Sequence, residues 1–140
     1  MNALARDVEV GAELFSVTRP IDRARLVRYA GASGDFNPIH WNERFALEVG
    51  LLGVIAHGML TMGLAGSALS DWLADPADVV EYGVRFTRPV LVPDPGEVEL
   101  RVTATVGAVD IEAGTARVDL AVKVEGAAVL GKAQARVRLH

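Results

Sequence analysis

The chain has 140 residues, of which 51% are apolar and 23% charged, and its formal net charge is −4. This length predicts one domain over residues 1–140, and the apolar content excludes an intrinsically disordered chain. The lack of surplus positive charge argues against a nucleic-acid partner, and the absence of cysteine excludes disulfides, thiolate catalysis and cysteine-held zinc.

The start of the chain carries Arg6, Asp7 and Glu9 and lacks a continuous apolar run. A secretory signal requires such a run, so the expected location is the cytoplasm. One uncharged segment, residues 49–70, is long enough to cross a bilayer. Because glycines and His57 interrupt it, we favour a buried central helix over a membrane span, and we expect no membrane partner.

The first elements in chain order are a short strand and a helix. The strand is predicted over residues 13–18 and is expected to end before Pro20. The helix is predicted over residues 21–32, with Asp22 in its first turn, where negative charge suits the helix dipole. The apolar residues at helical spacing, predicted to form its buried face, are Leu26, Val27 and Ala30.

A loop is predicted next, over residues 35–41, because the residue before Pro38 avoids the helical region. A short helix over residues 43–49 and another loop follow. The long apolar helix then covers residues 58–73, and the dipeptide at residues 75–76 closes it.

From residue 80 onward, apolar and polar residues alternate with period two. This pattern is typical of antiparallel strands with one buried and one solvated face. The apolar positions predicted to share a face in each strand are Tyr82, Val84 and Phe86; Val98, Leu100, Val102, Ala104 and Val106; Val118, Leu120, Val122 and Val124; and Ala133, Ala135, Val137 and Leu139.

A one-sided sheet needs an apolar cover, and an uncharged helix needs burial on most sides. We therefore predict an α+β fold in which a curved antiparallel sheet of about five strands wraps around the central helix. The small residues Gly63, Ala65, Gly66 and Ala68 are expected to allow close approach of the sheet. Open sheet edges tend to be paired, so a dimer is expected.

The stretch richest in chemistry is residues 33–40, where Asp35, Asn37 and His40 surround Pro38. An imidazole beside an ionised carboxylate is able to hold a water and pass protons in both directions. The same residue types also form ordinary turns by bonding their own backbone. The residues alone leave both interpretations open.

A second candidate is the start of the apolar helix, where His57 precedes Gly58. A helix start presents free N–H groups and a partial positive charge, and a glycine lets a ligand approach the backbone. Such a site polarises a carbonyl oxygen, although a packing or capping role explains both residues too. No metal-ligand spacing is present, so no metal or other cofactor is expected. Arg85 and Arg88 are predicted to be solvated strand residues rather than phosphate ligands.

Residues 29–40, Tyr-Ala-Gly-Ala-Ser-Gly-Asp-Phe-Asn-Pro-Ile-His, followed by Ala46 and then by His57-Gly58-Met59, resemble the hydratase signature of MaoC-like hydratases and dehydratases. The resemblance runs from about Val10 to the end of the chain. Within the family, the sequence of residues 39–41 and 56–63 is most similar to that of the catalytic B-type subunits of actinobacterial (3R)-hydroxyacyl-ACP dehydratase.

This resemblance implies a hot-dog fold and a hydro-lyase that reversibly hydrates trans-2-enoyl thioesters to (3R)-hydroxyacyl thioesters in fatty acid synthesis. It implies that Asp35 and His40 are the catalytic pair and that the Gly58 N–H binds the thioester carbonyl. The substrate is an acyl chain on acyl-carrier protein or CoA, and the assembly is a homodimer or a heterodimer with a related subunit. The further residues expected at the substrate or its acyl chain are Asn37, Ile55, Ala56, Leu51 and Leu52.

One departure concerns the central helix, where many (R)-specific enoyl-CoA hydratases have a serine. Alignment on His57 and Gly58 places Gly66 at that position, and Ser67 points about 100° away around the helix. The B-type subunits share this glycine, which favours that subfamily. The alternatives are an (R)-specific enoyl-CoA hydratase acting as a homodimer, a hot-dog thioesterase and a non-catalytic acyl-binding subunit.

Overall fold

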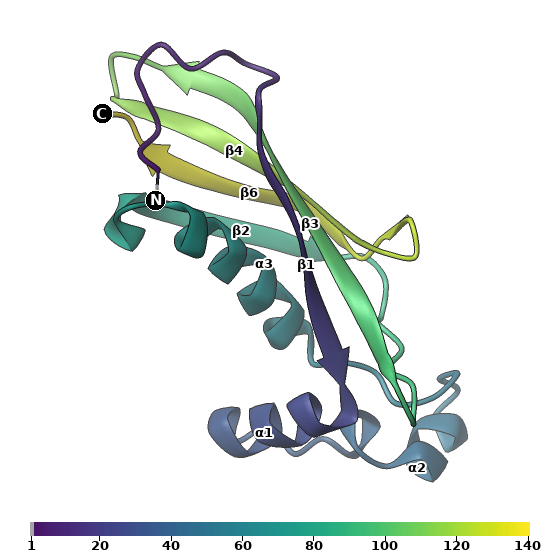
Figure 1. Cartoon of the computed structure of the whole chain (residues 1–140). Coiled ribbons are helices and arrows are strands. Elements are labelled where there is room, and N and C mark those ends of the chain that lie inside the picture. Colours follow the sequence, from purple (N-terminus) through teal and green to yellow (C-terminus); the bar gives the residue numbers. More distant parts are fainter. Residues whose placement is uncertain (1) are drawn as a thin grey trace.

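The computed structural model describes residues 2–140 and consists of one antiparallel sheet with a long helix on its concave side (Figure 1). The sheet order is β1-β3-β4-β6-β2, and the two-residue β5 pairs with β4. The strands are β1 (Glu13–Asp22), β2 (Val79–Phe86), β3 (Glu97–Asp110), β4 (Thr115–Val124), β5 (Ala127–Ala128) and β6 (Leu130–Arg138). The helices are α1 (Arg23–Ser33), α2 (Glu43–Glu48), α3 (Gly58–Trp72) and the 3₁₀ turns η1 (Pro38–His40) and η2 (Pro76–Asp78).

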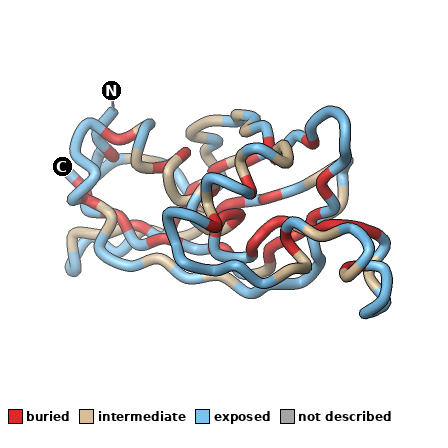
Figure 2. The backbone as a smooth tube through the Cα atoms, turned by 90° about the horizontal axis from the view of Figure 1, so that it is seen from below, coloured by how far each residue is buried: buried red, intermediate tan, exposed pale blue. Residues whose placement is uncertain are grey.

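The predicted alternation is confirmed in the three central strands of the sheet. Figure 2 shows buried and exposed positions along the chain, and the inward residues of β3, β4 and β6 form the core against α3. These buried residues are Val98, Leu100, Val102, Ala104, Val106, Val118, Leu120, Val122, Ala133, Ala135 and Val137. The hot-dog arrangement expected from the sequence is therefore present.

The prediction that Pro20 ends the first strand is wrong. Strand β1 continues to Asp22, and Pro20 pairs with Glu99 of β3. Because β1 lies at an edge of the sheet, a residue without an N–H is tolerated there. Asp22 consequently caps α1 rather than lying in its first turn, and its carboxylate accepts the N–H of Arg25.

Three residues predicted to face the core or the sheet lie outside it, and one of them is Phe86 of β2, which is 57% exposed. Val27 of α1 is 63% exposed, whereas its neighbours Leu26 and Ala30 are buried as expected. Gly63 of α3 has no atom near its virtual Cβ, so it does not serve close packing. Gly66 does, because a Cβ there would lie 2.8 Å from Cε2 of Tyr82.

Helix α3 buries one side and leaves the other open. Its buried residues are Leu60, Thr61, Ala65, Ala68 and Leu69, whereas Met59 is exposed. Within residues 2–140, no helix has the length and apolarity needed to cross a membrane. The neighbouring edge strand β2 also exposes Val80 and Phe86. The single chain thus presents an uncovered apolar margin along α3 and β2.

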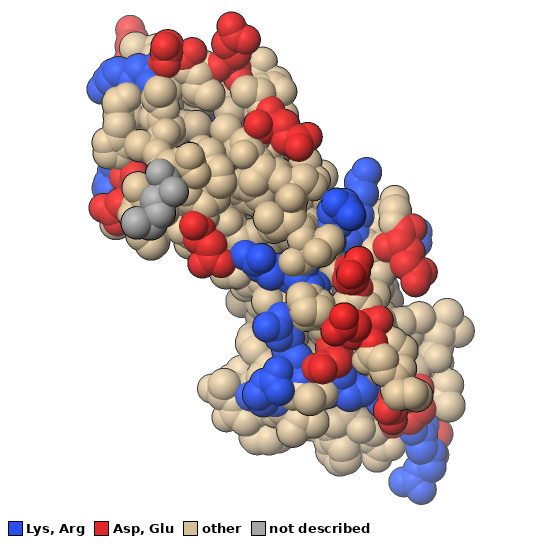
Figure 3. All heavy atoms as spheres, in the orientation of Figure 1, with Lys and Arg blue, Asp and Glu red and all other residues tan. Residues whose placement is uncertain are grey.

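Charged side chains of both signs share the face seen in Figure 3. Basic side chains gather midway along it, and acidic side chains lie around them. Two ion pairs belong to the segment where β1 enters α1, namely Arg19 with Asp71 and Arg23 with Glu43. Charges of both signs are therefore interleaved on that face.

Candidate active site

The loop that follows α1 is built from successive side-chain-to-backbone hydrogen bonds. The Ser33 Oγ accepts the N–H of Asp35, Asp35 Oδ1 accepts the N–H of Asn37, and Asn37 Oδ1 accepts the N–H of Ile39. Such local bonds let the backbone turn without a regular ladder. They fix the 3₁₀ turn η1, which ends at His40. The turn-forming interpretation of this stretch is therefore correct, and it positions the chemical groups instead of excluding them.

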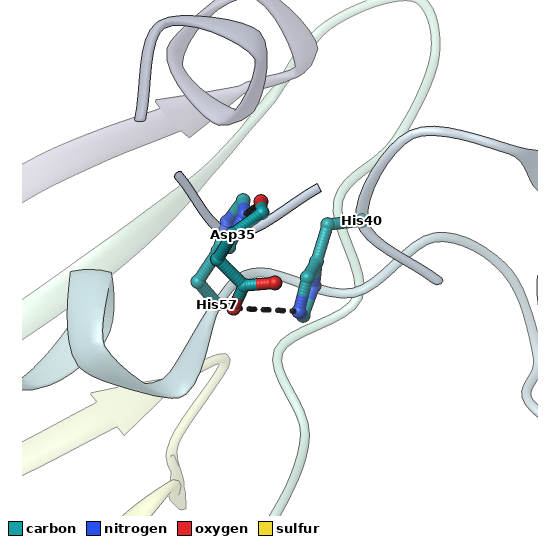
Figure 4. Close-up of side chains that lie close together, drawn as sticks. All are labelled: Asp35, His40 and His57. Carbon is teal, nitrogen blue, oxygen red and sulfur yellow. Dashed lines mark hydrogen bonds and ion pairs between the residues drawn. The ribbon is translucent and has the colours of Figure 1, made fainter. Parts of the chain in front are cut away.

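The carboxylate of Asp35 and the imidazole of His40 face each other across 4.0 Å, measured from Oδ2 to Nε2 (Figure 4). His40 is buried, and the Asp35 side chain is 51% exposed. Nδ1 of His40 lies 2.7 Å from the carbonyl oxygen of Ile55. A carbonyl only accepts, so Nδ1 carries the proton in the neutral ring and Nε2 offers its lone pair toward Asp35.

The 4.0 Å separation is longer than a direct hydrogen bond. A water or substrate hydroxyl seated beside the two groups is able to bond both at once. The pair is thus arranged to exchange a proton with a small oxygen ligand.

His57 lies directly behind this pair. Its ring stacks on the ring of His40 with centroids 3.8 Å apart, and its Nε2 lies 3.1 Å from the backbone oxygen of Asp35. Burial lowers the pKa of the His57 imidazole, and the hydrogen bond to Asp35 opposes this effect. His57 is therefore held as a neutral ring inside the site.

A cavity of about 310 Å³ opens beside His40 and reaches the start of α3. Its walls include the predicted residues His40, Ile55, Ala56 and Gly58. The N–H groups of Gly58 and Met59 bond no acceptor among residues 2–140, as expected for the first residues of a helix. The cavity therefore combines a proton-transfer group with free backbone donors.

The remaining predicted substrate residues lie elsewhere. Asn37 is absent from the cavity wall, because its amide oxygen is used within the turn. Leu51 packs against the core instead. Leu52 is 84% exposed and borders a separate, larger hollow of about 1140 Å³. Arg88 is exposed, as expected for a solvated residue, and it lies where the two hollows meet.

Several wall residues were not predicted from the sequence. They come from α3, from the end of β2 and the segment after it, and from the junction of β5 and β6, and they are Thr61, Phe86, Thr87, Pro89, Val90, Val129 and Leu130. Alternation marks such residues as buried or exposed but does not say which loop they meet. Phe86 also packs over Gly58, where a Cβ would lie 3.0 Å from Cε1 of its ring.

The polar groups of the site also have the spacing of a metal-binding cluster. One ligand atom from each of Asp35, His40 and His57 lies within 4.8 Å of the others. The two rings, however, are stacked with only 24° between their planes, so their in-plane lone pairs run side by side and do not converge as tetrahedral coordination requires. The geometry fits proton exchange better than metal ligation.

Comparison with known proteins gives one family model and several relatives that agree with one another. The family model described as "MaoC like domain" matches residues 8–124. The chain is 47% identical over 73 residues to 3-hydroxyacyl-thioester dehydratase X of Mycobacterium tuberculosis, covering 52% of this chain and 25% of that protein. It is 35% identical over 97 residues to 3-hydroxybutyryl-CoA dehydratase of Methylorubrum extorquens, covering 69% of this chain and 61% of that protein.

A solved structure described as a MaoC-like dehydratase is similar over nearly the whole chain. The superposition has a TM-score of 0.94 and 38% sequence identity, and it covers 99% of this chain and 43% of that one. The matches therefore span less than two thirds of each of these three proteins.

Proposed function

The chain belongs to the MaoC-like domain family, and on that premise we propose that it reversibly hydrates trans-2-enoyl thioesters to (3R)-hydroxyacyl thioesters. The observation that carries the proposal is the cavity whose wall holds both the His40 ring and the free N–H of Gly58. The Asp35 carboxylate is not part of that wall but lies 4.0 Å from the His40 ring. A (3R)-hydroxyacyl-ACP dehydratase subunit of fatty acid synthesis is the first assignment, and an (R)-specific enoyl-CoA hydratase is the second.

The proton transfers follow from the tautomer of His40. In the dehydration direction, Nε2 of His40 takes the proton from C2, and the electron pair of that C–H bond forms the C2–C3 double bond. The C3 hydroxyl, hydrogen-bonded by Asp35, departs as water after receiving one proton from the pair. The pair thus takes one proton and returns one in each turnover. Proton transfer by a positioned group contributes about 10²–10⁴-fold to such a rate.

The second requirement of this chemistry is stabilisation of the negative charge on the thioester oxygen, because removal of the C2 proton develops an enolate. The Gly58 N–H at the start of α3 is placed to donate to that oxygen, and the helix dipole adds a favourable field. Donors of this kind lower a barrier by about 3–4 kcal/mol. The missing side chain of Gly58 leaves room for the Phe86 ring, which packs where a Cβ would lie.

The acyl chain fits the apolar part of the cavity, where Ile55, Val90 and Leu130 lie. The carrier continues outward past the exposed Arg88, toward the larger hollow. Both carriers considered, CoA and acyl-carrier protein, occur in the cytoplasm, which is the location that we propose for the enzyme.

The uncovered apolar margin of α3 and β2 supports assembly with a second hot-dog subunit, either identical or related. Met59, Val80 and Phe86 are exposed there, and β2 is an unpaired sheet edge. The Asp35 carboxylate is also half exposed in the single chain, so a neighbouring subunit would close the site. Native mass of the purified chain, alone and with a co-expressed related subunit, tests this assembly.

The activity test uses crotonyl-CoA and longer enoyl chains on CoA and on acyl-carrier protein. A hydratase removes the enone absorbance without releasing thiol, whereas a thioesterase releases thiol. Because the chain has no cysteine, a thiol reagent reports only the released carrier. Loss of enone absorbance without thiol supports the proposal, and thiol release or no turnover on any carrier, with and without a partner subunit, contradicts it.

A further inference from the structure

His57 is the most enclosed polar side chain of the site and has no part in the proton transfers described above. It is 1% exposed and does not line the cavity. The His40 ring lies flat against it at 3.8 Å, and the Tyr29 ring of α1 meets it edge-on at 4.7 Å. A group enclosed in this way cannot touch a substrate in the cavity.

The hydrogen bonds of His57 define its tautomer. Nε2 lies 3.1 Å from the backbone oxygen of Asp35, and since a carbonyl only accepts, Nε2 carries the proton. Nδ1 is buried and has no partner among residues 2–140. A second proton on Nδ1 would create an unsatisfied buried donor and a charge stacked against His40, both of which are costly.

We infer that His57 is a positioning residue that works only as a neutral ring protonated on Nε2: its face supports His40, and its N–H fixes the backbone from which the Asp35 carboxylate projects. This inference rests on the proposed function and extends it, since it assigns a role to a residue outside the catalytic pair.

One short segment of backbone then sets the whole site. The Ile55 carbonyl orients His40, His57 holds Asp35, and the next residue, Gly58, supplies the free N–H. Residues 55–58 thus position all three chemical groups of the site. Misplacement by about 1 Å costs on the order of 10²-fold in rate, so this shared frame matters for turnover without any contact with substrate.

Two substitutions separate the functions of the ring and of its N–H. His57→Phe keeps an aromatic face against His40 and loses the donor to Asp35, whereas His57→Gln keeps a donor and loses the ring. We expect each to lower kcat by roughly tenfold to a hundredfold, the range for partners that orient a reacting group. KM should change by less than about threefold, because binding to the ground state is untouched.

His140→Gln is a matched control. His140 lies outside the site, where its ring bonds the buried carboxylate of Asp78, and this variant should keep the wild-type kcat. Thermal unfolding of all variants establishes that they are folded. A rise in KM alone, or a wild-type kcat in both folded His57 variants, overturns the inference.

A spectroscopic measurement decides the tautomer without any turnover. Long-range ¹H–¹⁵N spectra of the imidazoles, assigned by the signal missing in His57→Gln, should show His57 neutral and protonated on Nε2 at neutral pH. The titratable groups that face it are His40, Asp35 and Tyr29. A doubly protonated His57 at neutral pH, or a neutral ring with its proton on Nδ1, overturns the inference. A wild-type chain inactive on every thioester would instead remove the proposed function and leave this spectrum interpretable.

Discussion

The two ends of α3 have different surroundings, although one apolar sequence forms the whole helix. At its start, Gly58 and Met59 are exposed, their N–H groups bond no acceptor in the described chain, and a cavity opens beside them. In its second half, Ala65, Ala68 and Leu69 are fully enclosed under the sheet. The first end keeps polar groups available for a ligand, whereas the second end buries its sheet-facing residues.

The two ends of α3 therefore serve different properties: the first end serves activity and the second end serves stability. Burial of apolar side chains stabilises the fold in proportion to the area removed from water, whereas unsatisfied donors at a helix start contribute nothing to folding and are available for a ligand. Substitutions near the first end should therefore change turnover at nearly constant stability. Substitutions near the second end should change stability while each folded molecule keeps its activity.

The largest effect is expected from the catalytic pair. His40→Ala and Asp35→Asn should each lower kcat at least a hundredfold, within the range of about 10²–10⁴ for loss of a proton-transfer group. Steady-state hydration of crotonyl-CoA measures this loss, and thermal unfolding measures stability, which should change little for the half-exposed Asp35. The exposed Ile111, in the turn between β3 and β4, provides the control Ile111→Ala. Near-normal turnover in either folded variant would remove the pair from the mechanism.

The opposite effect is expected at the second end of the helix. Leu69 is 1% exposed, and Leu69→Ala should lower the free energy of unfolding by about 2–5 kcal/mol, because the cavity left behind cannot fully collapse. Urea unfolding measures the change, and Ile111→Ala should stay within about 0.5 kcal/mol of wild type. Under conditions where both proteins are folded, kcat should be preserved. Loss of kcat equal to that of His40→Ala would break the separation between the two ends.

The stabilising part of the molecule was the more predictable part. The buried residues of β3, β4 and β6 follow from a period of two in the sequence. The bounds of α3 follow from the apolar run that begins at Gly58 and from the dipeptide at residues 75–76 that closes it. Each of these signals lies within or beside the segment that it describes. The end of β1 cannot be predicted from local sequence signals. A proline ends a central strand but is tolerated at an edge, and the pairing of Pro20 with Glu99 depends on residues far along the chain.

The site was predictable in its chemical groups and much less so in its geometry. Asp35, His40 and Gly58 were predicted as candidate residues for the reaction. The structure places Asp35 4.0 Å from His40 and puts His40 and Gly58 on the wall of one cavity. Their orientation depends on two backbone carbonyls, those of Ile55 and Asp35, and any residue type supplies a carbonyl. For the same reason the stacking of His57 on His40 has no signal in the sequence.

A smaller effect on stability is expected at Gly66, where the absence of a serine departs from many related hydratases. The Tyr82 ring fills that space, and its hydroxyl donates to the Met62 carbonyl at 2.8 Å. Burial raises the pKa of this hydroxyl to about 12, so it remains a donor at neutral pH. Gly66→Ser should therefore destabilise by about 1–3 kcal/mol through overpacking, measured by urea unfolding. An unchanged stability would mean that the ring moves aside freely.

The smallest effect is a pH dependence of stability that originates at the first end of α3. Burial lowers the pKa of His57 in the fold below its ordinary value of 6.5, so at a pH between these two values the unfolded chain binds more protons than the native one. Stability should then rise with pH toward 6.5 and level off above it, and it should be lost as the pH falls below 6.5. Thermal unfolding midpoints over this range measure the slope.

His57→Gln removes this titrating group, so its stability should depend less on pH below 6.5 than that of wild type, whereas His140→Gln should keep the full contribution of His57. Equal slopes in wild type and His57→Gln would assign the acid sensitivity to other groups. A shallower slope in His57→Gln, together with a lowered kcat, would mean that the structure accepts a cost in acid stability in order to hold a neutral imidazole behind His40. The first end of α3 would then lower the stability of the fold at acidic pH because its groups are arranged for catalysis and not for packing.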